Sequence, residues 1–590
     1  MPINRTQVAE QDKWDLSGMF KTEAEYEEKY ASVKSRIPEC KKFENKLDRS
    51  NTLECLVLES ALSRDVELLY VYAMLRSDEN TADPKFQSLK GRAQMLWVEL
   101  ATATSFISGE LALMPTETLQ DMANDPSFVN FSCGLTSIIR NKAHILSPKE
   151  EKLMSEIGSF SGDFKNIFGM FDNADIKFGK VTNQEGEKVE LCHGMYSVLL
   201  GSNNQKVRAN AFNKYYKSYK DMLNTVAATY AGSVKKDCTM ASIRGYKSAL
   251  DCALQRERVT ENVYNNLLSA VKEATPHLHK YVALRKKALN VDTLNMYDMY
   301  VPITAEGRLD LSYNEAYDLV VDALAPLGTE YQELLRTART SRWIDVYETE
   351  NKRSGAYSSG CYDSNPHVLL NYNRTTHDVF TIAHELGHSL HSYMSTKAQC
   401  YEKADYVIFV AEVASTVNEV LMIKHLLKEA KGEMRKFLLS YYLDMFRTTL
   451  FRQTMFAEFE KFSHEQFEAG NTLTAELMSA KYYELNKEYY GSAVKHNKNI
   501  SYEWSRIPHF YNAFYVYKYA TGITAAVNIA NNILADDNYK SKYFEALSLG
   551  GSRDPLDILR VAEVDLESKV PFECAMAEFS AVLTELEGMM

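Results

Sequence analysis

Two histidines and a glutamate stand at a spacing that can bind and use a metal ion. The segment 375–394 contains His384-Glu385-Leu386-Gly387-His388, an H-E-x-x-H motif. On a helix, residues four apart share a face about one turn apart, so both imidazoles can point at one ion, with Glu385 beside it. Zinc held by three protein ligands keeps a position open for water and lowers the pKa of that water to about 7. The expected chemistry is attack of this water on a carbonyl, as in a zinc peptidase.

The flanking sequence predicts the helix that this motif requires. Thr375 followed three residues later by Asp378 matches a capping box at a helix start. Gly387 costs about 1 kcal/mol of helix propensity relative to alanine, but its small size allows another segment to approach closely. The alternative is that the two histidines have this spacing by chance. Because the chain has only 13 histidines in 590 residues, we favour a metal site over such a coincidence. The apolar positions of the predicted helix are Val379, Phe380, Ile382, Ala383, Leu386 and Leu390.

The third metal ligand has to come from outside the motif. In the H-E-x-x-H-x-x-G-x-x-H pattern a glycine and a further histidine follow, but this chain has His391 and Met394 at those positions. A downstream carboxylate is therefore the expected ligand, and the candidates are Glu402, Glu412 and Glu419.

Among these candidates we favour Glu412. It lies in the otherwise apolar stretch 409–415, where an unpaired carboxylate is costly and a metal would compensate that cost. Glu412 and Glu419 are seven apart on a predicted helix over 410–425, so they share a face. Glu419 is thus expected to accept a hydrogen bond from a ligand histidine. The alternative for Glu412 is a structural ion pair with a distant Arg or Lys.

A loop and a short strand precede the motif. The composition turns to Gly, Ser and Tyr over 354–360, which predicts a flexible segment that contacts substrate, with Gly355 and Tyr357 as candidates. The stretch 367–372 predicts a strand leading directly to the motif helix, with His367 as a further candidate. An edge strand beside a metal site can bind an extended peptide by strand addition. An ordinary hairpin is the alternative.

A histidine and several tyrosines are concentrated in 506–519. His509 and the nearby tyrosines can donate hydrogen bonds to the oxyanion of a tetrahedral intermediate. The residues alone leave open which of the four tyrosines donate with His509, and Tyr511 is a candidate contact with substrate. The alternative is an aromatic stripe that packs in a core.

The composition limits the class of protein. A net charge of −12 argues against nucleic acid or an anionic membrane as the main partner. Nine scattered cysteines without a C-x-x-C pair, together with a polar N-terminal stretch, predict a reduced, cytoplasmic setting. No apolar run approaches the 18 residues that a membrane span needs. The oligomeric state is left open.

Helical patterns dominate the rest of the chain. Thr22 with Glu25 and Ser312 with Glu315 are further capping boxes. The one clear exception is a predicted hairpin with strands over 176–181 and 188–191. We expect an N-terminal helical lobe over 1–190, with its boundary somewhere in 120–200, and a catalytic domain over 191–590.

Three segments together resemble a known family. H-E-L-G-H, F-V-A-E-V-A-S and I-P-H-F-Y-N-A-F-Y-V-Y-K-Y-A-T-G are similar to oligoendopeptidase F and, more distantly, to thimet oligopeptidase. The similarity extends from Trp14-Asp15-Leu16 to Leu549-Gly550-Gly551-Ser552, nearly the whole chain. The family typically has A-G-V-D near its C-terminus, where this chain has Ala562-Glu563-Val564-Asp565.

The resemblance implies a fold and a site. The fold expected is mostly α, with two helical lobes around a deep substrate channel and a small β-sheet near the metal. One Zn²⁺ per chain would be bound by His384, His388 and Glu412, with Glu385 as the base and His509 with nearby tyrosines at the oxyanion. Among those tyrosines we select Tyr515 and Tyr517. The implied activity is that of an endopeptidase acting on short unfolded oligopeptides. A zinc carboxypeptidase of similar helical build is the alternative.

Overall fold

The computed structural model describes residues 3–158, 160–304 and 308–590. Helices hold 71% of the residues and strands 3%, which confirms the predicted mostly α class. Thr22, Ser312 and Thr375 each accept a backbone N–H three residues further on, so all three predicted caps begin helices. The reciprocal bond of a capping box is present at Ser312 and Thr375, whereas the Glu25 carboxylate accepts the Lys21 N–H. Among the described helices, none combines the length and apolar character that crossing a lipid bilayer would need.

The chain divides into two compact units, each assembled from three segments. The first comprises Met1–Ile145, Arg308–His425 and Ile529–Val564. The second comprises Leu146–Gly307, Leu426–Asn528 and Asp565–Met590. The lobe boundary expected near residue 190 does not coincide with an end of any of these segments. The division into an N-terminal lobe and a catalytic domain stays a prediction.

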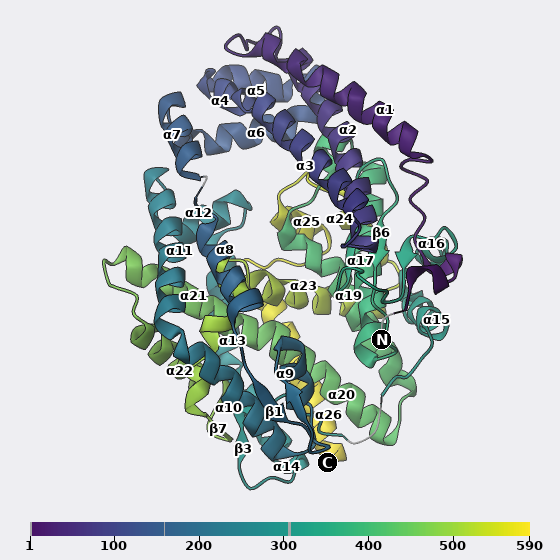
Figure 1. Cartoon of the computed structure of the whole chain (residues 1–590), viewed down its shortest axis with the longest axis vertical. Helices are drawn as coiled ribbons and strands as arrows, with labels where there is room; N and C mark the ends of the chain where they lie inside the picture. The colour runs from purple at the N-terminus through teal and green to yellow at the C-terminus, as the bar shows by residue number, and fades with distance from the viewer. Residues whose placement is uncertain (1–2, 159, 305–307) are drawn as a thin grey trace. The chain divides into compact units, whose positions relative to one another are not determined.

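Figure 1 labels the main elements of both units. The first unit contains α1 (Glu23–Arg36), α2 (Thr52–Glu79), α3 (Pro84–Thr104), α4 (Phe106–Leu113), α5 (Thr116–Asn124), α6 (Ser132–Asn141), α15 (Tyr313–Ala323), α16 (Thr329–Thr340), β4 (Ile344–Asp345), β5 (Tyr357–Ser359), β6 (His367–Leu369), α17 (Thr376–Ala398), α18 (Tyr401–Ala404), most of α19 (Ile408–Glu429), the end of α23 (Tyr517–Ala535), α24 (Lys540–Ser548) and α25 (Pro555–Val561). The second contains α7 (Pro148–Gly158), α8 (Asp163–Met170), β1 (Lys180–Thr182), β2 (Lys188–Glu190), α9 (His193–Leu200), α10 (Gln205–Asp221), α11 (Leu223–Ile243), α12 (Ala249–Arg256), α13 (Glu261–Glu273), α14 (Thr275–Ala288), β3 (Leu294–Asn295), α20 (Gly432–Phe446), α21 (Arg452–Glu468), α22 (Ala475–Tyr490), β7 (Val494–Lys495), the start of α23 and α26 (Val570–Met589).

Helix α17, which carries the H-E-x-x-H motif, is central to the first unit. Its start is fixed by reciprocal hydrogen bonds: the Thr375 hydroxyl accepts the Asp378 N–H at 3.1 Å, and the Asp378 carboxylate accepts the Thr375 N–H at 2.9 Å. The helix packs against α19, α24 and the small sheet formed by β4, β5 and β6. All six of its predicted apolar positions are buried.

Gly387 sets the distance between α17 and α19. A Cβ atom at this position would lie 2.5 Å from Ser415 Cα and 2.8 Å from the Ala414 carbonyl oxygen. Both of those atoms belong to backbone, so a side chain could be accommodated only by moving the helices apart. The absence of a side chain therefore brings the backbone of α19 to within van der Waals contact of the motif helix.

The β-structure corrects one expectation. The stretch that begins at His367 does form a strand, β6, but it is the central strand of a three-stranded sheet, parallel to β4 and antiparallel to β5. The expected edge strand is instead β5, which lies in the segment predicted to be a flexible loop. The partner β4 is only two residues long, too short for a local sequence pattern to reveal. The predicted hairpin is confirmed as β1 and β2, with a shorter first strand than expected.

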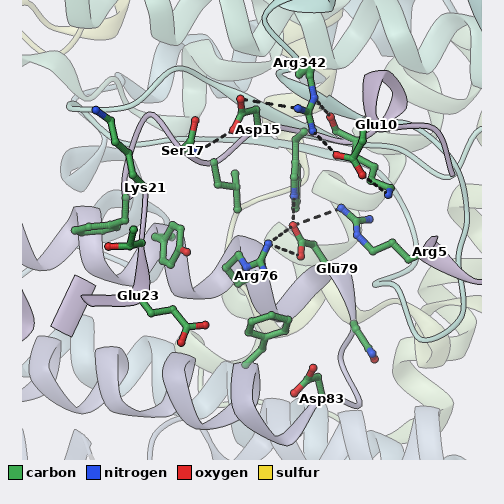
Figure 2. A pocket seen from close by; sticks show the side chains of 18 of the residues that line it. Arg5, Glu10, Asp15, Ser17, Lys21, Glu23, Arg76, Glu79, Asp83 and Arg342 are labelled. Carbon is green, nitrogen blue, oxygen red and sulfur yellow. Dashed lines mark hydrogen bonds and ion pairs between the residues drawn. The ribbon is translucent and has the colours of Figure 1, made fainter. Parts of the chain in front are cut away.

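The N-terminal segment is tied into the first unit through Glu79, as Figure 2 shows. The carboxylate of Glu79 accepts the Trp14 indole N–H at 2.7 Å and pairs with Arg76 at 2.9 Å and Arg5 at 3.4 Å. Arg342 reaches Glu10 at 3.1 Å on the opposite wall. These groups line a polar pocket of about 730 Å³. Trp14 itself is buried in a cluster with residues of α2 and β6, so the first residues of the chain are part of the core.

Glu563, where the resembled family has glycine, adopts φ = +55°, in the left-handed region that favours glycine. Its side chain pairs at the surface with Lys542 at 2.5 Å. The backbone conformation at this position is therefore the one that a glycine would adopt, and it is held here at a local cost in strain.

The close approach at Gly387 generates a stability prediction. Gly387→Ala should destabilise the protein by about 1–3 kcal/mol, the usual cost of overpacking a core, despite the gain in helix propensity. Since Glu412 lies on α19, bound metal should also decrease. Urea unfolding and metal content per chain measure both effects.

Gly91→Ala is the matched control. Gly91 also lies within a helix, α3, but a Cβ there would meet no atom within 4 Å. This variant should be stabilised by up to about 1 kcal/mol. Equal responses of the two variants would refute the packing role of Gly387.

Candidate metal centre and active site

The two motif histidines present equivalent nitrogens to one point. His384 Nε2 and His388 Nε2 lie 3.2 Å apart. The other ring nitrogen of His384, Nδ1, lies 3.0 Å from a carboxylate oxygen of Glu419, which can only accept when ionised. His388 hydrogen-bonds to the backbone of Ala411. When both rings are neutral and carry their protons on the outer nitrogens, the two Nε2 lone pairs face each other, an arrangement that favours a cation between them.

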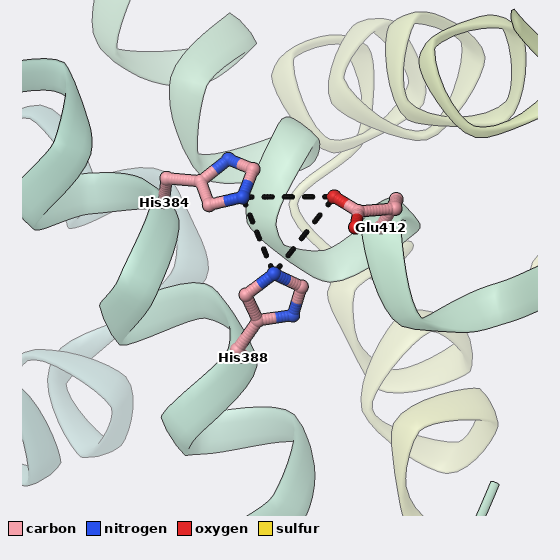
Figure 3. Close-up of side chains that lie close together, drawn as sticks. All are labelled: His384, His388 and Glu412. Carbon is pink, nitrogen blue, oxygen red and sulfur yellow. Dashed lines mark hydrogen bonds and ion pairs between the residues drawn. The ribbon is translucent and has the colours of Figure 1, made fainter. Parts of the chain in front are cut away.

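Glu412 completes the group from α19, as Figure 3 shows. Its Oε2 lies 3.6 Å from His384 Nε2 and 3.8 Å from His388 Nε2. Tetrahedral zinc with bonds of about 2.0–2.1 Å to nitrogen and oxygen requires its ligand atoms to be about 3.4 Å apart. The three observed separations bracket that value, so the donor set fits zinc in both chemistry and spacing. Glu402, the other candidate, lies on α18 and accepts a hydrogen bond from the Ser60 hydroxyl instead.

The contacts around the three ligand atoms hold them in place. Glu419 lies two turns after Glu412 on the same helix and reaches the outer nitrogen of His384, as the sequence predicts. Between them in sequence, the Asn418 amide donates to the Ala383 carbonyl at 3.0 Å and accepts from the Tyr331 hydroxyl at 3.1 Å. These polar contacts, together with the close approach at Gly387, fix α19 relative to α17.

Glu385 lies next to His384, His388 and Glu412, which we call the metal group, but its carboxylate contacts the small sheet. Its carboxylate is 7% exposed and accepts a hydrogen bond from the backbone N–H of Ser358 on β5. The Ser358 hydroxyl in turn lies 2.8 Å from the hydroxyl of Ser389, one turn after Glu385 on α17. The base expected from the motif is therefore oriented by the edge strand of the sheet.

The charges of this group are strongly coupled. Burial raises the pKa of Glu385 to about 7, and the Glu412 carboxylate adds to that rise while His384 opposes it. Burial lowers the pKa of His384, but the carboxylates of Glu419, Glu385 and Glu412 outweigh it and raise that pKa to about 9. Burial and the charge of His384 lower the pKa of His388 to about 3. Without a metal, these three carboxylates thus keep a second proton on the His384 ring at neutral pH, so that the ring is positively charged.

A pocket of about 400 Å³ opens beside His384 and Glu385. Gly355, a predicted substrate contact, lies on its rim at φ = +86°, and its carbonyl accepts the side-chain amide of Asn371 at 2.7 Å. One face of α17 supplies His377 and Thr381, which precede His384 by seven and three residues. The remaining lining residues are Ala356, Leu370, Asn371, Tyr372, Asp378 and Glu419.

Two predicted substrate contacts lie elsewhere. The His367 ring is 3% exposed, packs edge-on against Trp14 and lies 3.2 Å from the Asp15 carbonyl oxygen. The Tyr357 hydroxyl donates to Asp78 at 2.8 Å. Because alternate residues of a strand point to opposite faces, these side chains are directed into the N-terminal part of the unit and away from the metal group. The expected side-chain contacts of His367 and Tyr357 with substrate are therefore not supported.

The predicted oxyanion residues belong to the second unit. His509 is exposed, and the ring of Tyr515 stacks on it with centroids 6.0 Å apart. Tyr519 meets His509 edge-on at 5.9 Å and Tyr515 at 5.4 Å. Partial desolvation of the ring by the surrounding protein, together with the charges of Arg452 and Lys165, lowers the pKa of His509, so its neutral form is favoured near pH 7.

Tyr511 and Tyr517 do not join this cluster. Tyr517 is 1% exposed and its hydroxyl faces Glu257 at 3.4 Å. The Tyr511 ring stacks on Phe168 at 4.6 Å in the core of the same unit. Both positions differ from the expected roles. Tyr519 is one of the four tyrosines of 506–519 considered as donors, but it was not selected, although its four-residue spacing from Tyr515 is that of neighbours on one side of a helical turn.

Sequence models of known families match most of the chain. The model described as "Peptidase family M3" matches residues 198–578, and that described as "Oligopeptidase F" matches residues 110–178. The metal group, Glu385 and the His509 cluster all fall within the first of these matches.

Characterised relatives match over full length. The chain is 39% identical to "Oligopeptidase PepF" of Bacillus subtilis, covering 100% of this chain and 88% of the relative, and 39% identical to "Oligoendopeptidase F homolog" of Lactococcus lactis, covering 100% and 99%. Among solved structures, a putative peptidase from Chlamydophila abortus has a TM-score of 0.92 at 33% identity, covering 100% of both chains. Oligoendopeptidase-F from Enterococcus faecium has a TM-score of 0.76 at 33% identity, covering 96% of this chain and 99% of that one. The chain therefore belongs to peptidase family M3, among its oligoendopeptidase F members, and is a peptidase of oligopeptides.

Proposed function

We propose that this peptidase is a zinc-dependent endopeptidase that cleaves internal bonds of short unfolded oligopeptides. The observation that carries the proposal is the convergence of His384 Nε2, His388 Nε2 and Glu412 Oε2, all within 4.8 Å of one another, beside the buried carboxylate of Glu385. The three atoms would hold one Zn²⁺ per chain and leave a position open. When bound, this ion supplies a Lewis acid that lowers the pKa of a water molecule.

Glu385 is the general base in this proposal. Its carboxylate would take a proton from the attacking water and pass it to the nitrogen of the leaving amine as the carbon–nitrogen bond breaks. The Ser358 N–H holds the carboxylate in one orientation during both transfers. The pKa of Glu385 is about 7 before metal binds. Because this pKa is close to neutral pH, the carboxyl group can both accept and return a proton there.

His509, Tyr515 and Tyr519 are proposed to donate hydrogen bonds to the developing oxyanion. A neutral imidazole carries one N–H donor, and a tyrosine hydroxyl carries another. The mutual packing of the three rings supports a joint role, because each ring restricts the rotation of the others. Tyr519 takes the place first expected for Tyr517.

The edge of β5 is proposed to bind the peptide backbone. The Ser358 N–H points outward to Glu385, and alternate residues of a strand present their N–H and C=O to the same edge. Ala356, two residues earlier, therefore presents its backbone groups on that edge and lines the pocket beside Glu385. An extended substrate could add to the sheet there, with a side chain in the pocket.

Replacing the base should separate metal binding from catalysis. In Glu385→Gln the amide retains the shape but cannot take a proton, so kcat/KM should fall by about 10²–10⁴-fold while one zinc per chain remains. The substrates should be short peptides blocked at both ends, with cleavage products identified by mass spectrometry. Cleavage confined to free C-termini would establish the carboxypeptidase alternative, and no cleavage by zinc-loaded wild type would refute the proposed activity.

Zinc affinity should depend on pH through His384. Its pKa is about 9 in the metal-free protein, so below that pH zinc must displace a proton. The apparent affinity should therefore rise about tenfold per pH unit between about pH 7.5 and 8.5, with about one proton released per ion. Competition with a chromophoric chelator gives the affinity, and calorimetry in buffers of different ionisation enthalpy gives the proton count.

Glu419→Gln is the comparison for this titration. Removing the nearest carboxylate lowers the pKa of His384, so the proton release near pH 7.5 should shrink. Unchanged proton release in this variant, or none in wild type, would contradict the assigned role of the pair.

The tyrosines can be ranked by removing single hydroxyl groups. Tyr515→Phe or Tyr519→Phe should lower kcat by about 10²–10³-fold, as loss of one oxyanion donor does. Tyr517→Phe should leave kcat nearly unchanged and reduce stability by about 1 kcal/mol, because its hydroxyl is directed to the partly buried carboxylate of Glu257. A large loss of kcat in Tyr517→Phe alone would restore the original expectation.

A further inference from the structure

A buried carboxylate in the second unit has no role in the chemistry proposed above. Glu460 on α21 is completely buried. Its Oε1 accepts the backbone N–H of Phe514 at 2.7 Å, while its Oε2 has no hydrogen-bond partner among the described residues. Burial raises the pKa of Glu460 to about 8. Burying a carboxyl group with one unpaired oxygen costs folding free energy. Its hydrogen bond from the Phe514 N–H compensates part of that cost.

That contact holds a strained residue. Phe514 has φ = +54°, in the left-handed region that a bulky side chain rarely adopts. Such conformations persist only where the surroundings over-determine them, and they concentrate at functional sites. Two residues one turn apart on α21 hold Phe514: Glu460 binds its N–H, and the His464 ring packs on its ring at 4.5 Å.

The support continues behind His464. Its Nδ1 lies 2.8 Å from the Glu460 carbonyl oxygen, within hydrogen-bond distance, and its Nε2 lies 3.7 Å from a carboxylate oxygen of Asp237 on α11. Contacts from α21 itself and from α11 thus hold the His464 ring in place against Phe514. Phe514 is 1% exposed, so its ring cannot reorient without unpacking this core.

Phe514 lies within the segment that carries the proposed oxyanion donors. The chain turns there through successive hydrogen bonds: the Asn512 N–H donates to the His509 carbonyl at 2.9 Å, and the Tyr515 N–H donates to the Asn512 carbonyl at 3.2 Å. Immediately after the strained residue, the Tyr515 ring returns to stack on His509. Relaxation of Phe514 to an ordinary negative φ would rotate the chain by roughly 100° or more about one bond and carry Tyr515 away from His509.

We propose that Glu460 is a positioning residue that keeps Tyr515 and His509 in register by holding the Phe514 N–H. The inference rests on the proposed function of those two residues. What Glu460 supplies is a hydrogen-bond acceptor in a fixed place and not a negative charge. A neutral carboxyl group and an amide would offer the same kind of oxygen to the Phe514 N–H.

Three variants test the acceptor. Glu460→Gln retains an oxygen acceptor and should keep kcat within about threefold of wild type. Glu460→Met fills a similar space without an acceptor and should lower kcat about 30–300-fold, the range expected when an oxyanion donor is displaced, with KM changed less than about threefold. Glu460→Asp withdraws the acceptor by one methylene group and should give an intermediate loss, which keeps the test available if Glu460→Met does not fold.

Thr454→Val is the matched control. Thr454 is also completely buried on α21, but its hydroxyl bonds to the Leu450 carbonyl of its own helical segment at 2.8 Å. This variant should retain wild-type kcat. Binding of a phosphinic peptide, a mimic of the tetrahedral intermediate, should weaken in Glu460→Met in parallel with kcat, whereas binding of an uncleavable N-methylated peptide should not.

A double-mutant cycle with Tyr515→Phe distinguishes positioning from general stability. If Glu460 acts through Tyr515, Glu460→Met should cost little more in a Tyr515→Phe background. Additive losses, wild-type kcat in Glu460→Asp, or equal losses in the Gln and Met variants would each overturn the inference. If Tyr515→Phe loses activity but Glu460→Met does not, only this inference fails. Full activity of Tyr515→Phe and of a His509→Ala variant would overturn the proposed oxyanion roles as well.

Discussion

Helices α17 and α19 approach each other at Gly387 as closely as two backbones can, and the arrangement of the metal group depends on that contact. The two histidines lie on one helix, and the carboxylates of Glu412 and Glu419 lie on the other. Larger side chains at a helix contact increase the interaxial distance by up to about 2 Å, and an increase of that size would take Glu412 out of reach of an ion held by the histidines. The distances of 3.2–3.8 Å among the ligand atoms are therefore a property of helix packing as much as of the motif.

Electrostatics explains why this arrangement favours a bound cation. Three carboxylates and two imidazoles are crowded into a mostly buried region, where like charges repel strongly and isolated charges are poorly solvated. A proton on His384 relieves part of that repulsion, and a divalent cation relieves more of it. The same crowding keeps Glu385 from being a simple, fully ionised carboxylate, which suits a group that accepts and then returns a proton.

The sequence predicted the local features well and the long-range ones unevenly. The capping box at Thr375 and the shared face of His384 and His388 followed from residue types at fixed spacings on a helix, where position in sequence determines position on a face. Glu412, which the structure places beside them, was chosen because its surroundings in sequence are apolar. The edge strand could not be identified in this way, because β4 pairs with β6 across more than 20 residues of intervening chain. The direction of the Tyr517 side chain depended on Glu257, which is distant in sequence. His367 was misjudged for the same reason, since its partner Trp14 lies near the other end of the chain.

Each compact unit is assembled from three separate stretches of polypeptide, and this has a consequence for biosynthesis. The helix that packs behind the metal helix, α24, lies more than 140 residues after it, and the first unit is completed only by the segment that ends at Val564. On the ribosome, where domains usually fold as they emerge, neither unit can therefore close its core until almost the entire chain has been made. The apolar face of α17 therefore stays exposed until α19 and α24 have been made, whereas α2 can pack early against α1 and α3. Expression of either half of the chain alone is accordingly an unpromising route to a folded fragment.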